Sequence, residues 1–165
     1  MIDRVSGLWT AGGKAGLGRI RVEKDVVPDD WFFKAHFFQD PVQPGSLGLE
    51  MMLQALEVLL LEGGQSAGLA HPEFEAPATG VPLTWKYRGQ VVPEHATITV
   101  DAEITALPPD PRGVLALAEG SLWVDGRRIY HAAFSTRIVS GHPSGPECTA
   151  EGDATEPTRP SWAKE

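Results

Sequence analysis

One long helix, apolar on most of its sides, limits what this chain can fold into. The pattern predicts it from Ser46, a good cap residue, to the stop at Gly63-Gly64, with the sequence SLGLEMMLQALEVLLLE. Glu50, Gln54 and Glu57 are spaced three or four residues apart, so they form one polar line on a helix that is otherwise to be buried. A single helix of this kind needs a sheet that curves around it.

After the helix, the hydrophobic period changes to two residues, which is typical of strands with one buried face. Asp125-Gly126 is a strong signal for a two-residue hairpin turn. Residues 65–80 show no clear period, and we expect a loop there. The pattern thus predicts an α+β fold in which an antiparallel sheet surrounds a central helix. The expected strands are Leu17–Val22, Leu83–Val91, Ala96–Leu107, Val114–Val124 and Arg127–Val139.

Length and composition indicate one domain. The chain has 165 residues, 42% of them hydrophobic, and we expect a domain over residues 1–140 and a polar tail or linker over residues 141–165. A formal net charge of -8 without a basic run argues against a nucleic-acid partner. The single cysteine, Cys148, excludes an intrachain disulfide and a cysteine-based metal site. Neither a signal peptide nor a membrane span is predicted, so we expect a cytoplasmic protein without a membrane partner.

A candidate acid–base pair lies at the start of the helix. His36 stands in the aromatic run WFFKAHFF, and the turn DPVQPG that follows is stiffened by two prolines. Imidazole titrates near neutral pH, and carboxylates such as Glu50 are seldom buried without a partner or a role. The alternative is a packed histidine and a glutamate that reaches the surface.

The stretch from His36 to Glu50, HFFQDPVQPGSLGLE, resembles the motif of the β-hydroxyacyl-thioester dehydratases of fatty acid synthesis. The flanks Trp31-Phe32-Phe33 and Trp85–Val91 (WKYRGQV) are similar to dehydratase domains of polyunsaturated fatty acid synthases and related iterative polyketide synthases. The resemblance implies the hot-dog fold, a curved antiparallel sheet wrapped around one long central helix. It also implies edge-to-edge pairing, as a homodimer or with a second hot-dog unit, and an active site between the two units.

The resemblance further implies a 3-hydroxyacyl-[acyl-carrier-protein] dehydratase, a lyase that forms the 2-enoyl thioester with neither cofactor nor metal. In such an enzyme His36 is the base, Glu50 of the partner unit is the acid, and the backbone N–H of Gly45 binds the thioester carbonyl. We expect Gln54 to hold Glu50 or the substrate hydroxyl, and Ser46 to contact substrate. Glu50 replaces the aspartate typical of the branch that also shifts the double bond, so isomerase activity stays open.

Two other functions of this fold remain, an acyl thioesterase and a non-catalytic hot-dog partner. Thioesterases usually lack the 14-residue spacing between His36 and Glu50, and the intact pair argues against the non-catalytic role. The implied partner is an acyl carrier protein, which an acidic chain binds only through a local basic patch. The candidate residues for its phosphopantetheine phosphate or its surface, which otherwise form an ordinary solvated face, are Lys34, Lys86, Arg88, Arg127 and Arg128.

Overall fold

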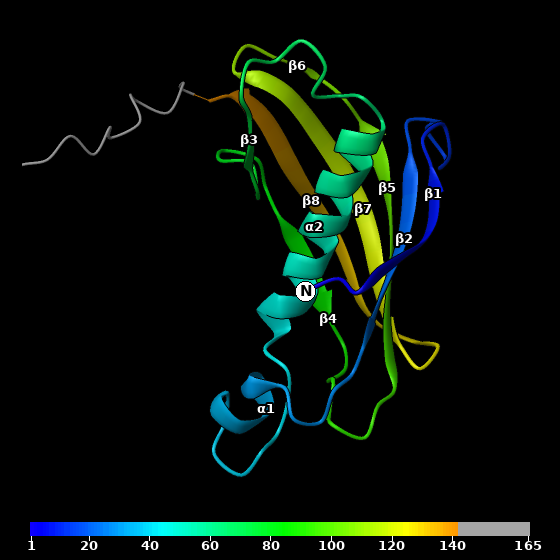
Figure 1. Cartoon of the computed structure of the whole chain (residues 1–165), viewed down its shortest axis with the longest axis vertical. Helices are drawn as coiled ribbons and strands as arrows, with labels where there is room; N and C mark the ends of the chain where they lie inside the picture. Colours follow the sequence, from blue (N-terminus) through cyan, green and yellow to red (C-terminus); the bar gives the residue numbers. More distant parts are fainter. Residues whose placement is uncertain (142–165) are drawn as a thin grey trace, which may run out of the picture.

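A computed structural model gives the structure of residues 1–141 (Figure 1). One curved antiparallel sheet wraps around a long helix, and a short helix lies beyond one end of it (Figure 1). The strands are β1 (Arg4–Trp9), β2 (Arg19–Asp25), β3 (Pro72–Glu75), β4 (Thr84–Tyr87), β5 (Thr97–Ala106), β6 (Pro109–Asp110), β7 (Gly113–Val124) and β8 (Arg127–Ser140). The helices are α1 (Trp31–Ala35) and α2 (Gly45–Glu62).

The sheet has the order β1-β2-β5-β7-β8-β3, with β4 also paired to β8 and β6 paired to β7. Strands β3 and β4 pair with opposite halves of β8, so both lie at the same edge of the sheet. The β7–β8 hairpin turns at Asp125 and Gly126, whose φ angles are 48° and 79°. Positive φ at both central residues is what a tight hairpin turn of this kind requires, and the predicted hairpin is confirmed.

The hydrophobic core lies between the concave face of the sheet and α2. Strand β5 shows the alternation most clearly, because Ile98 and Val100 are fully buried while Thr99 and Asp101 point to the other face. Leu56 and Leu60 of α2 are fully buried against the sheet. The predicted α+β arrangement of a central helix and an antiparallel sheet is therefore confirmed.

The start of α2 differs from the prediction. The helix begins at Gly45, one residue earlier than predicted, and its cap position is Pro44 without a side-chain cap hydrogen bond. Ser46 lies inside the first turn and is not the cap. Proline suits a helix start because the first N–H groups have no partner within the helix. The other end agrees with the sequence, since the helix stops at Gly63.

Three strands were not predicted, namely β1, β3 and β6. Strand β1 is an edge strand with mostly exposed residues, and β3 lies at the other edge within the segment predicted as a loop. Neither has a buried face with a two-residue period, so neither carries the signal that reveals β5. The predicted strand Leu83–Val91 is also too long, because β4 pairs with β8 only over Thr84–Tyr87.

Among residues 1–141, no helix is both long enough and apolar enough to cross a membrane. The predicted polar tail, residues 141–165, lies outside the described part of the chain from residue 142 onward. The described part of the chain includes all the predicted site residues.

Candidate functional site

The segment that carries His36 starts with the one-turn helix α1. Phe32 and Phe33 are buried in the core and anchor this helix. Asp30 precedes it and lies 3.4 Å from the ammonium group of Lys24. His36 follows its last turn and donates its backbone N–H to the carbonyl of Phe32 at 3.0 Å. The core thus fixes the backbone from which the His36 side chain extends.

The imidazole of His36 has a defined tautomer. Its Nδ1 lies 3.1 Å from the backbone carbonyl oxygen of Val42, in the turn before α2. A carbonyl oxygen only accepts hydrogen bonds, so Nδ1 carries the proton of the neutral ring and Nε2 keeps a free lone pair. The ring also packs against Phe37, with centroids 4.1 Å apart. The turn therefore holds a half-buried histidine in the form that accepts a proton at Nε2.

The first backbone N–H groups of α2 have no partner within the helix. Gln43 donates its N–H to Val91 at 2.9 Å, which ties the turn to the segment before β5. At Gly45 a Cβ would lie 2.8 Å from the ring of Trp85 and 3.5 Å from that of Tyr87. Any larger residue would displace these aromatic rings. Glycine at this position keeps the helix start, with its unpaired N–H groups and positive dipole end, close to the aromatic side chains.

The polar line of α2 is partly buried. Gln54 donates from Nε2 to Oε1 of Glu50 at 2.9 Å, so the amide holds the carboxyl group as the spacing predicted. Glu57 lies further along the same line and is half-buried rather than freely solvated. Burial raises the pKa of Glu57 above its usual value, and the neighbouring charge of Glu50 adds to the effect. On this polar line the carboxyl group of Glu57 is therefore less solvated than a carboxyl group on the surface.

The structure brings only some of the predicted site residues together in one chain. Glu50 contacts Gln54, and His36 contacts the turn that leads to Gly45. Within residues 1–141, no hydrogen bond or ion pair joins His36 to Glu50. Ser46 is exposed beside Gly45, so its hydroxyl is open to solvent. A site that uses both His36 and Glu50 therefore needs either a substrate that spans them or a second chain.

Sequence reasoning missed an aromatic cluster at the helix start. The rings of Trp85 and Tyr87 meet edge to face with their centroids 5.7 Å apart, and both pack on Tyr130, at 5.4 and 5.1 Å. Burial raises the pKa of Tyr130 strongly, and the nearby Tyr87 contributes, so Tyr130 stays neutral. The alternation of side chains along β4 places Trp85 and Tyr87 on one face of the strand, and this could have been predicted from the sequence. Tyr130 joins them only because β8 pairs with β4, with Tyr130 opposite Tyr87.

Gln43 is a further residue that the sequence did not single out. Its side chain is 2% exposed, and both its amide oxygen and its amide nitrogen lack a hydrogen-bond partner among the described residues. The indole N–H of Trp85, at the same helix start, is also buried without a partner in that part of the chain. Unpaired buried polar groups are costly, so we expect a water molecule or a ligand to complete their hydrogen bonds.

No metal site accompanies these residues in the part of the chain that the structure describes. Within residues 1–141, no three side chains of His, Cys, Asp or Glu are grouped closely enough to hold an ion. The chemistry that the arrangement offers is proton transfer at His36 and Glu50 and hydrogen bonding at the start of α2.

Residues 1–133 match the family model of the FabA-like domain. The chain belongs to the FabA-like family. This FabA-like domain is also 39% identical over 147 residues to a polyunsaturated fatty acid synthase subunit of Thraustochytrium sp.. The match covers 87% of the chain but 9% of that relative, so the domain corresponds to a small part of a much longer protein. The predicted similarity to polyunsaturated fatty acid synthases is confirmed.

Solved structures establish the fold of the FabA-like domain. The dehydratase heterocomplex ApeI:P from Xenorhabdus doucetiae has a TM-score of 0.56 at 15% identity, covering 82% of this chain and 80% of that chain. A hypothetical thioesterase from Streptococcus pneumoniae, solved with coenzyme A, has a TM-score of 0.56 at 10% identity, covering 85% and 88%. Similarity at these identities concerns the fold alone. The FabA-like domain has the hot-dog fold, as predicted.

Proposed function

We propose that this FabA-like domain is a 3-hydroxyacyl-[acyl-carrier-protein] dehydratase that converts a 3-hydroxyacyl thioester into the 2-enoyl thioester. The observation that carries the proposal is the hydrogen bond from His36 to the Val42 carbonyl, because it leaves Nε2 free to accept a proton. The 39% identity to a polyunsaturated fatty acid synthase subunit supports fatty acyl thioesters as the substrate class.

In the first part of the reaction, Nε2 of His36 removes a proton from C2 of the substrate. The electrons of the broken C–H bond move toward the thioester, whose oxygen gains negative charge. The N–H of Gly45 at the start of α2 stabilises that oxygen, helped by the helix dipole. The absence of a side chain at Gly45 leaves room for the ring of Trp85, which packs against the helix start beside this N–H.

In the second part, the carboxyl group of Glu50 protonates the C3 hydroxyl. The C3–O bond breaks, the C2–C3 double bond forms, and water leaves. Gln54 keeps the Glu50 carboxyl in place through the 2.9 Å hydrogen bond. His36 then carries one extra proton and Glu50 has lost one, so proton exchange with solvent restores both groups.

The assay that tests this function follows the acyl chain and the thiol separately. The purified protein is incubated with 3-hydroxyacyl thioesters of several chain lengths, and enoyl formation is measured together with free thiol. A dehydratase forms the enoyl thioester without releasing thiol. Thiol release without enoyl formation would instead indicate a thioesterase. Activity only after a second hot-dog protein is added would indicate a non-catalytic partner.

We further propose that two hot-dog units share each active site. His36 and Glu50 do not contact each other in one chain, and the edge strand β4 pairs only with β8 among the described strands. Phe37 and Phe38, next to His36, are 55% and 90% exposed. Large aromatic side chains beside an incomplete site support a second copy that covers them and brings its own Glu50.

A complementation experiment tests the shared site. His36→Ala and Glu50→Gln proteins are mixed under conditions that exchange protomers, with different tags to prove exchange. In a mixed two-fold dimer one site carries both substitutions and the other carries neither. Random pairing makes half of the dimers mixed, so activity should recover to about a quarter of wild type.

Recovery in this mixture requires that the two groups of a site come from different chains. If both came from one chain, every site would keep one defect. Proven exchange with activity still at the level of the single variants would therefore exclude the shared site. The dehydratase proposal itself would survive that outcome, because the acid–base roles do not depend on which chain supplies each group.

A further inference from the structure

The peptide unit between Val42 and Gln43 forms a hydrogen bond on each of its two polar sides. Its carbonyl oxygen, on Val42, lies 3.1 Å from Nδ1 of His36. Its N–H, on Gln43, donates to the carbonyl oxygen of Val91 at 2.9 Å. A peptide unit is planar, so its C=O and N–H groups cannot turn independently of each other. The bond to Val91 therefore fixes the direction from which the Val42 carbonyl meets the imidazole.

These two bonds are shielded from solvent. Val42, Gln43 and Val91 are 3%, 2% and 1% exposed, so bulk water does not compete for their backbone groups. Hydrogen bonds that follow one another in such surroundings polarise each other. Donation from Gln43 to Val91 therefore makes the Val42 carbonyl a better acceptor for the proton on Nδ1 of His36.

The two ends of this chain of bonds come from neighbouring strands. His36 follows β2 in the sequence, and Val91 precedes β5. Strand β2 pairs with β5 along its whole length, and beyond their last pair the N–H of Val26 donates to the carbonyl of Ala96 at 2.9 Å. The segments that carry the histidine and its support therefore leave the sheet at the same end, side by side.

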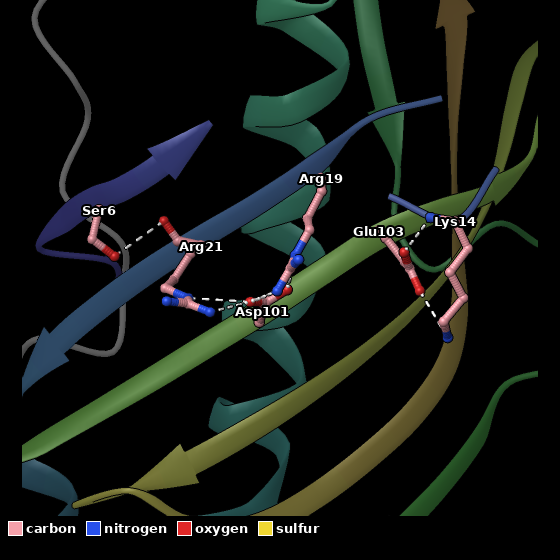
Figure 2. A network of polar contacts seen from close by, with 6 residues as sticks. All are labelled: Ser6, Lys14, Arg19, Arg21, Asp101 and Glu103. Carbon is pink, nitrogen blue, oxygen red and sulfur yellow. Dashed lines mark hydrogen bonds and ion pairs between the residues drawn. The ribbon is translucent and has the colours of Figure 1, made fainter. Parts of the chain in front are cut away.

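Side chains reinforce this strand pair on the face of the sheet that points away from α2. Figure 2 shows Arg19 and Arg21 of β2 converging on Asp101 of β5. Their nitrogens lie 2.7 and 2.8 Å from that carboxylate, and Lys14, in the loop before β2, is 3.1 Å from Glu103. Pairs of opposite charge across two strands stabilise one register. The position of Val91 relative to His36 thus depends on a strand pair that is held by both backbone and side chains.

We infer that the Val42–Gln43 peptide unit is a positioning group for dehydration, which relays the hydrogen bond of Val91 to Nδ1 of His36. The hydrogen bond at one ring nitrogen of a histidine decides which nitrogen carries the proton. The relay keeps the proton of the neutral ring on Nδ1 and leaves Nε2 able to accept the C2 proton. This inference rests on the proposed dehydratase function, since it names how the base of that reaction is held. Val91 and Gln43 act through His36 and not on the substrate.

The test weakens the distant end of the relay and leaves the Val42–Gln43 peptide intact. The α-hydroxy acid analogue of valine at residue 92 turns the Val91 carbonyl into an ester carbonyl. An ester lacks the resonance of a peptide, so this oxygen accepts hydrogen bonds more weakly. In the ester protein kcat for dehydration should fall about tenfold with KM unchanged, comparable to the loss caused by removing the partner of a metal-bound histidine.

Two controls separate the relay from other effects of the ester. The ester also removes the N–H of Val92, which donates to Nδ1 of His95 at 3.1 Å. His95→Ala removes that bond and leaves the Val91 carbonyl unchanged. An ester at Ala78 breaks a comparable backbone bond, from Ala78 to the Ser135 carbonyl of β8 at 3.1 Å. Both controls should keep the kcat of wild type.

Nitrogen NMR of His36 tests the relay without catalysis. In wild type the neutral ring should carry its proton on Nδ1, and the ester at residue 92 should raise the fraction with the proton on Nε2. Equal fractions in the two proteins, unchanged kcat in the ester protein, or an equal loss of kcat in either control would overturn the inference.

Wild type alone also provides a test, which holds even if the ester protein does not fold. The N–H of Gln43 should exchange slowly with deuterium, because it is buried and bonded to Val91. Rapid exchange of this N–H, or a wild-type ring of His36 with its proton on Nε2, would overturn the inference. If wild type dehydrates no thioester, the proposed function fails, while the NMR measurements still decide on the relay.

Discussion

The His36→Ala variant is expected to lower kcat for dehydration by about 10²–10⁴-fold while the protein remains folded. The substitution removes the proposed proton acceptor, whose Nε2 is freed by the bond from Nδ1 to Val42. Glu50→Gln should cause a loss of similar size, because an amide cannot donate the proton that the departing hydroxyl needs. Both losses should persist at saturating substrate, since they concern the chemical step rather than binding.

Matched controls separate these roles from general damage. His71→Asn changes an exposed histidine away from the site, and Glu62→Gln changes an exposed carboxylate at the end of α2, the same helix that carries Glu50. Both controls should keep the turnover of wild type. Circular dichroism and thermal unfolding verify that all four proteins fold. Near wild-type kcat for either His36→Ala or Glu50→Gln would remove that residue from the proposed mechanism.

The largest expected loss of stability comes from Arg137→Met. Arg137 is 1% exposed and forms ion pairs with Glu75 of β3 and with Asp110 of β6, the latter at 3.0 Å. These bonds tie two peripheral segments to β8. Removing the guanidinium leaves Glu75 and Asp110 with the more distant Arg112, at 4.0 and 3.8 Å, so the free energy of unfolding should fall. Urea unfolding followed by fluorescence measures the difference.

Arg4→Met is the matched control, because Arg4 also pairs with two carboxylates, Glu23 and Asp25, but is 44% exposed. Water replaces its contacts, so its loss should have a much smaller effect. Equal destabilisation by Arg4→Met and Arg137→Met would contradict the argument from burial. A fully active, fully stable Arg137→Met protein would show that the network does not hold β3 and β6 in place.

The difference in unfolding free energy between wild type and Arg137→Met should depend on pH. The backbone N–H of Arg112 and the guanidinium of Arg137 hold the pKa of Asp110 below its usual value, although partial burial opposes them. A carboxyl group whose pKa is lowered by folding stabilises the protein above its unfolded pKa and loses this contribution as the pH falls. The difference in unfolding free energy between wild type and Arg137→Met should therefore become smaller as the pH is lowered below about 4.

Features with a local cause were predictable from the sequence. The apolar period of Gly45–Glu62, the alternation in β5 and the Asp125-Gly126 turn each depend on residues close together in the chain. The hydrogen bond between Glu50 and Gln54 follows from their spacing of one helical turn. The candidate residues His36, Gly45 and Glu50 lie in one continuous stretch, and their roles, which remain predictions, come from the resemblance of that stretch to the dehydratase motif.

Tertiary structure alone decided the features that depend on strand pairing. Strands β1 and β3 exist because β2 and β8 provide partners, and no buried face marks them in the sequence. The meeting of Trp85 and Tyr87 with Tyr130 follows from the register of β8 with β4, and the pairing of Arg137 with Glu75 follows from its register with β3. Register joins residues far apart in the chain, and its free energy comes from packing across the whole sheet, so no local pattern contains it.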